Sequence, residues 1–174
     1  DAGTGNHSLG WICGLKTDRW VGITGDPHRR DRMQRDFSAR MRPHDRLIVG
    51  NWTDPGLLAG ERFDVVLADY LLGAVDGFAP YFQDILFKRL RPHVRGKLYV
   101  VGLAPYPDRA QTPGGEAILE IVRLRDACIL LAGHRCYREY PLSWVRRSLE
   151  NSGFEVDNAL SLNIRYGARF INGQ

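Results

Sequence analysis

The first six residues combine a carboxylate with a glycine turn. In Asp1-Ala2-Gly3-Thr4-Gly5-Asn6, an acidic side chain stands just ahead of a Gly-x-Gly step. Glycines between a strand and a helix let the backbone pass close to a ligand, towards which the helix points its N-terminus. We therefore expect a nucleoside-containing ligand to be bound at this turn, by Asp1, Gly3, Thr4, Gly5 and Asn6.

Position 8 bears on the class of that ligand. A dinucleotide fingerprint requires a third glycine there, but the residue is Ser8. The carboxylate of Asp1 would also repel a phosphate, and it suits a cationic amino-acid group better. A nicotinamide-dependent oxidoreductase is therefore an alternative that the turn disfavours.

Short apolar runs alternate with amphipathic segments along the rest of the chain. We expect strands at residues 19–24, 46–50, 63–69, 97–103 and 154–162, and helices after the glycine turn and at about 29–39, 78–90, 113–133 and 141–151. Strands that are nearly all apolar predict a parallel sheet covered on both faces. The expected fold class is α/β, a doubly wound, mostly parallel sheet with helices on both faces, in a single domain over residues 1–174.

The glycine turn needs a strand to hold it. The residues before Asp1 ought to supply the first central strand, so we expect a longer parent protein of which this domain is incomplete at both ends.

The order of these landmarks resembles the class I S-adenosylmethionine-dependent methyltransferases. Residues 1–5 resemble that family's first motif, an acidic residue followed by x-Gly-x-Gly, and residues 21–23 resemble its second strand. Residues 63–72 resemble the fourth strand with the loop beyond it, and residues 90–98 resemble the loop into the fifth. The resemblance covers the chain from Asp1 to about Leu162, and it implies a Rossmann-like fold with S-adenosyl-L-methionine as the cofactor.

Two positions depart from the family's pattern. Thr24 stands where an acid usually holds the ribose hydroxyls, and Asp26 lies two residues further on, either as the ribose ligand or as a turn aspartate. Asn51-Trp52 resembles the pair that contacts adenine, in which Asp is the more usual first member. An asparagine can still bond an exocyclic amine and a tryptophan can stack on the ring, although a turn Asn and a core Trp would look the same.

The end of the expected strand 63–69 is where open α/β sheets place ligands. Asp69 and Tyr70 lie there, and the resemblance implies that they contact the cofactor or the substrate. Methyl transfer also needs a proton acceptor when the acceptor is a hydroxyl or an amine. The candidates for that base are His134, His7 and Asp69, with Tyr137 and Tyr140 as candidate substrate contacts in the segment 133–140.

Missing motifs narrow the choice of acceptor. No Asn/Asp-Pro-Pro-Tyr follows residues 63–69, so the motif typical of amide or exocyclic amino methylation is absent. With that class of acceptor disfavoured, a small molecule is the preferred methyl acceptor. Because Thr24 and Asn51 stand where the family usually has acidic residues, a catalytically degenerate, binding-only module is the alternative.

Charge and cysteine content bear on partners and location. The net charge is +4, but the arginines between His28 and Arg46 are interleaved with Asp31, Asp36 and Asp45, which is typical of a solvated helix face. Nucleic acid is therefore an unlikely partner, and an RNA-binding methyltransferase with strongly salt-dependent affinity is the alternative.

Three cysteines with no close pair suggest neither disulfides nor a zinc site, and the longest apolar run, 127–132, is too short to span a bilayer. We expect a cytoplasmic protein that binds no metal and no membrane.

Overall fold

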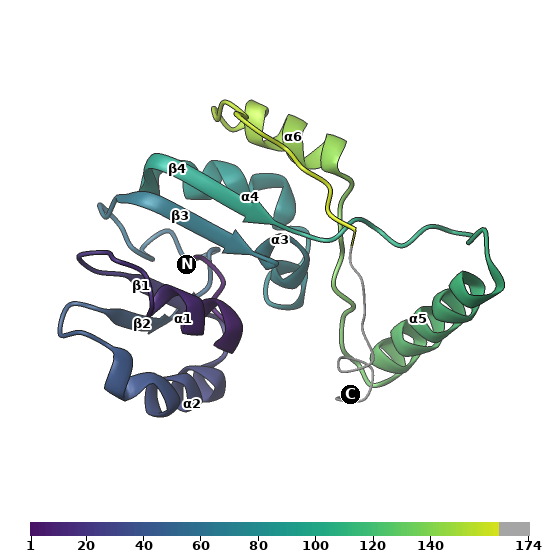
Figure 1. The fold of residues 1–174 in the computed structure, drawn as a ribbon, viewed down its shortest axis with the longest axis horizontal. Coiled ribbons are helices and arrows are strands. Elements are labelled where there is room, and N and C mark those ends of the chain that lie inside the picture. Colours follow the sequence, from purple (N-terminus) through teal and green to yellow (C-terminus); the bar gives the residue numbers. More distant parts are fainter. Residues whose placement is uncertain (164–174) are drawn as a thin grey trace.

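Four short parallel strands form two pairs in the computed structural model, which describes residues 1–163. Strand β1 (Val21–Thr24) pairs with β2 (Arg46–Val49), and β3 (Phe63–Asp69) pairs with β4 (Val94–Val101). Figure 1 shows the two pairs next to each other, with the N-terminus between them. The chain is therefore mixed α/β with parallel strands, as expected, but the strands form two small sheets and not one doubly wound sheet.

The first residues of the chain connect the two pairs. The Ala2 N–H donates to the Leu67 carbonyl on β3 at 2.7 Å, and the Thr4 N–H donates to the Ile23 carbonyl on β1 at 2.6 Å. The glycine turn is thus held from both sides.

Within residues 1–163, six α-helices accompany these strands. They are α1 (Asn6–Ile12), α2 (Pro27–Phe37), α3 (Leu71–Ala74), α4 (Gln83–Leu90), α5 (Pro113–Leu131) and α6 (Leu142–Asn151). Thr112 caps α5 by accepting the Gly115 N–H at 3.1 Å, and Pro113 is its first residue. Gly153 follows α6 with a φ of 80°, in the left-handed region that glycine tolerates best. No helix within residues 1–163 is long and apolar enough to cross a membrane.

The helix expected at 78–90 begins later than predicted. It starts at Gln83, and Phe78 and Tyr81 lie before it, each about half exposed or more. The buried carboxylate of Asp76 accepts the Tyr81 N–H at 3.3 Å and the Gln83 side chain at 3.2 Å. This local hydrogen bonding stabilises an irregular turn, with Tyr81 at a φ of 66°, in place of the first helical turns.

The strand expected at 154–162 does not form. Residues 154–163 are extended but pair with no strand, and they are held by side chains instead. Phe154 packs against the core, and Asp157 forms an ion pair with Lys97 at 2.8 Å. An apolar run becomes a strand only where a neighbouring edge accepts its backbone hydrogen bonds.

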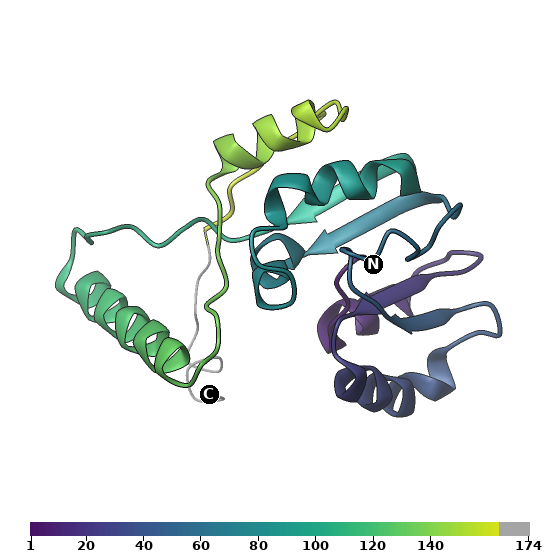
Figure 2. The same ribbon diagram turned by 180° about the vertical axis from the view of Figure 1, so that it is seen from behind.

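Helix α5 stands apart from the rest of the chain. In both views of the ribbon it lies away from the strands (Figure 1, Figure 2). Of its residues only Leu119 is buried, whereas Ile121, Leu124 and Leu131 are 62%, 66% and 88% exposed. These side chains recur at helical spacing along one face of α5, and among residues 1–163 nothing covers that face.

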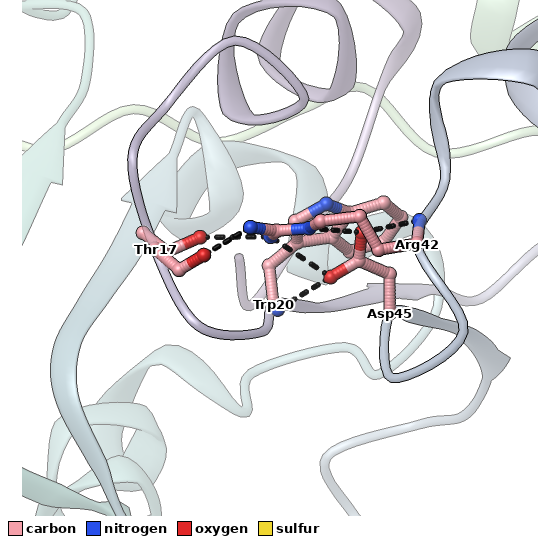
Figure 3. A network of polar contacts seen from close by, with 4 residues as sticks. All are labelled: Thr17, Trp20, Arg42 and Asp45. Atoms are coloured by element: carbon pink, nitrogen blue, oxygen red, sulfur yellow. Dashed lines mark hydrogen bonds and ion pairs between the residues drawn. The ribbon is translucent and has the colours of Figure 1, made fainter.

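One acidic residue of the arginine-rich stretch is buried, contrary to the prediction of a solvated face. Figure 3 shows Asp45 accepting hydrogen bonds from the backbone N–H groups of Trp20 at 3.0 Å and Arg42 at 2.8 Å. The Arg42 guanidinium adds an ion pair at 2.9 Å and also donates to Thr17. Asp45 therefore joins the loop before β1 to the loop before β2.

Candidate functional site

A cleft of about 440 Å³ lies at the carboxyl ends of the strands. The chain returns to it several times: its lining includes the glycine turn, the residues that follow β1, β2 and β3, and isolated positions in later segments. These lining residues are Ala2 to Ser8, Ile23 to Gly25, Arg29, Gly50 to Trp52, Asp69 to Leu71, Ala74, Val75, Phe78 and Tyr137. The volume is within the range of small-molecule sites.

Thr4 holds the glycine turn in place. Its buried hydroxyl accepts the Ile23 N–H at 2.9 Å and donates to the Asp1 carbonyl at 3.3 Å. A Cβ on Gly22 would lie 2.8 Å from that hydroxyl, so β1 requires glycine where the turn crosses it. Thr4 lines the cleft, but its hydroxyl is engaged in these two hydrogen bonds to the backbone.

The two glycines of the turn have different roles. A Cβ on Gly3 would lie 2.9 Å from the Leu71 side chain, so packing against α3 requires this glycine. A Cβ on Gly5 would meet nothing within 4 Å, and its φ of −121° suits any residue. Gly5 therefore leaves space open in the cleft without being needed for the fold, and Asn6 follows it on the exposed first position of α1.

The Asp1 carboxylate lies at the base of the turn. One oxygen, Oδ1, accepts the Gly3 N–H at 3.3 Å, while Oδ2 is buried and has no hydrogen-bond partner within the described part of the chain. Asp1 lines a larger neighbouring cavity rather than the 440 Å³ cleft itself. Its free oxygen is an unsatisfied acceptor beside the predicted ligand site.

Asp69, Tyr70 and His7, which were predicted separately, all line the cleft. Burial raises the pKa of Asp69 above its ordinary value, and the nearby positive charge of His7 partly offsets this. Tyr70 has a φ of 51° and is 45% exposed, with its ring free of the core. A non-glycine residue in the left-handed region is uncommon, and it directs the chain from β3 into α3 at the cleft.

Asn51 and Trp52 line the cleft but are bound to the protein itself. The Asn51 amide donates to the Phe78 carbonyl at 3.0 Å and accepts from the Thr53 backbone at 3.0 Å. The Trp52 indole is 5% exposed and donates to the Ala2 carbonyl at 2.7 Å. Asn51 thus makes the contacts of a turn asparagine, and Trp52 those of a core tryptophan.

Asp26 does not line the cleft. Its carboxylate accepts the backbone N–H groups of His28 at 2.9 Å and Arg29 at 3.1 Å, as the N-cap of α2. These hydrogen bonds, above all that from Arg29, lower the pKa of Asp26. Thr24, which replaces the usual acid, does line the cleft, and its hydroxyl accepts the Asp26 N–H at 3.3 Å.

Only one of the three predicted residues in segment 133–140 lines the cleft. Tyr137 does so, beside Gly77. His134 follows α5 and is exposed, and Tyr140 stacks on Trp144 with ring centroids 4.1 Å apart. The segment is anchored by Arg135, which pairs with the buried Asp76 at 3.3 Å.

Phe78 is a cleft residue that the sequence pattern did not predict. Its ring fills the space beside Gly25, where a Cβ would approach it to 2.7 Å, and it is 49% exposed. The sequence pattern placed Phe78 at the start of the helix expected at 78–90, whereas it lies in the turn before α4. The neighbouring Gly77 and Pro80 were the signals that the helix starts later.

Within residues 1–163 no group of three or more His, Cys, Asp or Glu side chains could hold a metal ion. No known protein family matches the chain, and no curated protein matches it in sequence.

Proposed function

We propose that this chain is an S-adenosylmethionine-dependent methyltransferase that binds its cofactor in the 440 Å³ cleft. The observation that carries the proposal is convergence: residues predicted from four separate segments, around Gly5, Asn51, Asp69 and Tyr137, line one cavity. That cavity lies at the carboxyl ends of parallel strands, where open α/β sheets bind ligands.

The residues present fit this cofactor. Gly5 leaves open, in the cleft, the space that a Cβ would fill. Next to the cleft, Asp1 has a buried carboxylate oxygen without a hydrogen-bond partner among residues 1–163. A sulfonium compound with an ammonium group supplies positive charge, which the carboxylate of Asp69 in the cleft and that of Asp1 beside it favour over a phosphate. Asn51, whose amide nitrogen donates one of its two hydrogens to Phe78, keeps the other for an adenine.

The cofactor supplies an electrophilic methyl group, and the chain aligns the acceptor with it. Tyr70, Phe78 and Tyr137 offer half-exposed aromatic rings for a small, apolar or aromatic acceptor. Methylation of a hydroxyl or amine acceptor would release a proton, which needs an acceptor in the cleft. Asp69, which lines the cleft with a raised pKa, takes this proton, with His7 beside it.

A binding-only module is the second candidate, and Asp26 is the observation that favours it. Its carboxylate is engaged as the cap of α2, so no acid stands free at the end of β1 to bind ribose hydroxyls. Such a module would bind the cofactor and transfer no methyl group.

Calorimetric titration with S-adenosylmethionine and, separately, with NADH tests the proposal. We expect binding of the sulfonium compound alone. Binding of NADH alone would favour an oxidoreductase, and binding of neither would overturn the proposed function. Transfer of an isotope-labelled methyl group to a panel of phenols and amines then separates the enzyme from the binding-only module.

Replacing Asp69 with asparagine is expected to weaken cofactor binding roughly tenfold while stabilising the fold at neutral pH. A hydrogen bond to a charged group contributes about 1.5–3 kcal/mol, and its loss reduces affinity. The variant is expected to be more stable, because the raised pKa of Asp69 means that its negative charge is unfavourable in the native state. Titration calorimetry and thermal unfolding measure the two effects.

The pH dependence of the stabilisation has a definite sign. The folded-state pKa of Asp69 is raised, so its charged carboxylate destabilises the native state. This destabilisation appears as pH rises through the ordinary aspartate pKa, and it is absent below that value. Asp69→Asn should therefore melt higher than the wild type at pH 7 and equally at pH 3. Equal melting temperatures at both values would contradict this interpretation of Asp69.

A further inference from the structure

Helix α5 exposes a continuous apolar stripe, which we call the α5 seam. Its members recur at alternating intervals of four and three residues, and all are exposed: Ala117, Ile121, Leu124, Cys128 and Leu131. This is the spacing of the a and d positions in a two-stranded coiled coil, where each such side chain packs into a hole on the facing helix. The helix has 19 residues and is about 28 Å long, and the seam contains no charged side chain.

The opposite side of α5 is turned toward its own chain. Four residues there, all off the seam, are buried or half-buried: Leu119, Val122, Asp126 and Ile129. The Asp126 carbonyl accepts the Cys136 thiol at 3.5 Å, and the Arg123 guanidinium donates to the Asp108 carbonyl at 2.6 Å. The segments that lead into and out of the helix therefore bond to it away from the seam. They hold α5 apart from the strands, with the seam facing outward (Figure 2).

The charges beside the seam fit a second, parallel copy of α5. Glu120 and Arg125 flank the seam on opposite sides, at the positions called g and e, where coiled coils form ion pairs between helices. In a parallel pair a g residue lies next to the e residue five positions later in the other helix. Glu120 of each copy would thus meet Arg125 of the other copy. Arg125 is 52% exposed beside Asp126, and Glu120 forms no ion pair within residues 1–163.

The reverse orientation lacks this complementarity. An antiparallel pair centred on Leu124 would bring Arg125 of one copy opposite Arg125 of the other, and like charges that face each other repel. The apolar seam therefore supplies the attraction, and the flanking charges select the parallel orientation.

We propose that α5 is a dimerisation helix: two copies of this chain pair through their α5 seams as a parallel coiled coil, with Glu120–Arg125 ion pairs between the copies on both sides. The exposed side chains of Ile121, Leu124 and Leu131 become buried at the centre of this contact, which removes apolar surface from water. The seam covers only about two heptads. The interface is therefore small, and we expect dimer and monomer to exchange with concentration.

Leu124→Glu tests the seam, and Leu130→Glu is its matched control. The two leucines lie on the same helix and are 66% and 62% exposed, but Leu130 is off the seam. Sedimentation of the whole chain between about 1 µM and about 1 mM should show a monomer–dimer equilibrium for the wild type and for Leu130→Glu. Leu124→Glu should weaken association at least about a hundredfold, because each dimer loses two buried leucines. Circular dichroism should show the same helix content for both variants.

Exchange of charges tests the parallel orientation. Glu120→Arg should weaken the dimer about tenfold, because it places like charges together on both sides of the seam. Adding Arg125→Glu to that variant should restore association, since the two signs are then exchanged. A short bifunctional thiol reagent should also join two wild-type copies, because the parallel register places Cys128 of one copy against Cys128 of the other. Mass spectrometry should locate the bridge at that residue in both copies.

A chain that stays monomeric over the whole concentration range would overturn the proposal and leave the seam to a different partner. A dimer that Leu124→Glu leaves intact would also overturn it, because another surface would then form the contact. So would a dimer that the second charge substitution fails to restore, or one whose copies are not bridged at Cys128. None of these measurements depends on cofactor binding, so the proposed function is tested separately.

Discussion

Replacing Gly5 with valine is expected to abolish S-adenosylmethionine binding while leaving the fold intact. The site has a φ of −121° and open space around the missing Cβ, so the backbone accepts the new side chain. That side chain would then occupy the space where the turn approaches the ligand, because Gly5 lines the cleft. We expect at least a roughly hundredfold loss of affinity, comparable to about 3 kcal/mol of overpacking.

Gly102→Val is the matched control. A Cβ on Gly102 would also meet nothing within 4 Å, but this glycine follows β4 and does not line the cleft. Calorimetry should show wild-type affinity for this control, and thermal unfolding should show similar stability for both variants. Undiminished binding by Gly5→Val would rule out the assigned cleft.

Asp45→Ala is expected to destabilise the fold by about 2–3 kcal/mol, because the buried carboxylate accepts hydrogen bonds from two backbone N–H groups and from the half-exposed Arg42 guanidinium. The side chain is fully buried in its ion pair with Arg42 and accepts the Trp20 N–H. Alanine leaves that buried N–H with no acceptor. Urea unfolding measures the loss, and Asp45→Asn, which keeps one acceptor oxygen, should lose less.

Asp31→Ala is the control for Asp45→Ala. Asp31 pairs with Arg30 at 3.2 Å, but both side chains are exposed, so the expected loss is below about 1 kcal/mol. Similar losses for the two variants would show that the network in Figure 3 carries no special stability.

The effect of Asp45 also depends on pH. Burial opposes its ionisation, but the hydrogen bonds from Arg42 and Trp20 outweigh this and lower its pKa. The stability that Asp45 contributes to the fold is therefore complete above the ordinary aspartate pKa of about 4. It is lost as pH falls through the lower pKa of the folded state. The difference between wild type and Asp45→Ala should narrow in that range.

The strands were predictable where burial and backbone pairing agree. Residues 21–24 and 63–69 are apolar runs bounded by turns, and both form strands that pair. Residues 154–162 mix apolar side chains with Glu155, Asp157, Asn158 and Ser161, and no strand within residues 1–163 pairs with them. A local pattern cannot show whether the partner that would complete a strand is present, and the same limit explains the exposed face of α5.

The buried acids were harder to predict than the cleft. Asp45 lies in a polar stretch and Asp76 in an apolar one, and only the folded chain shows that each collects hydrogen bonds from distant residues. Tyr137, in contrast, was predicted from its place after the long helix, and it does line the cleft. Motif order identifies a region, whereas the residue that enters the cavity depends on long-range packing.

The proposed cofactor site is tested most directly by following the backbone amide signals of the isotope-labelled protein by NMR as S-adenosylmethionine is added. We predict saturable shifts at Gly3, Gly5, Asn6 and Tyr70, and unchanged signals in α5. Saturable shifts confined to α5, or no shifts at the glycine turn at any cofactor concentration, would contradict the proposed site and with it the proposed function.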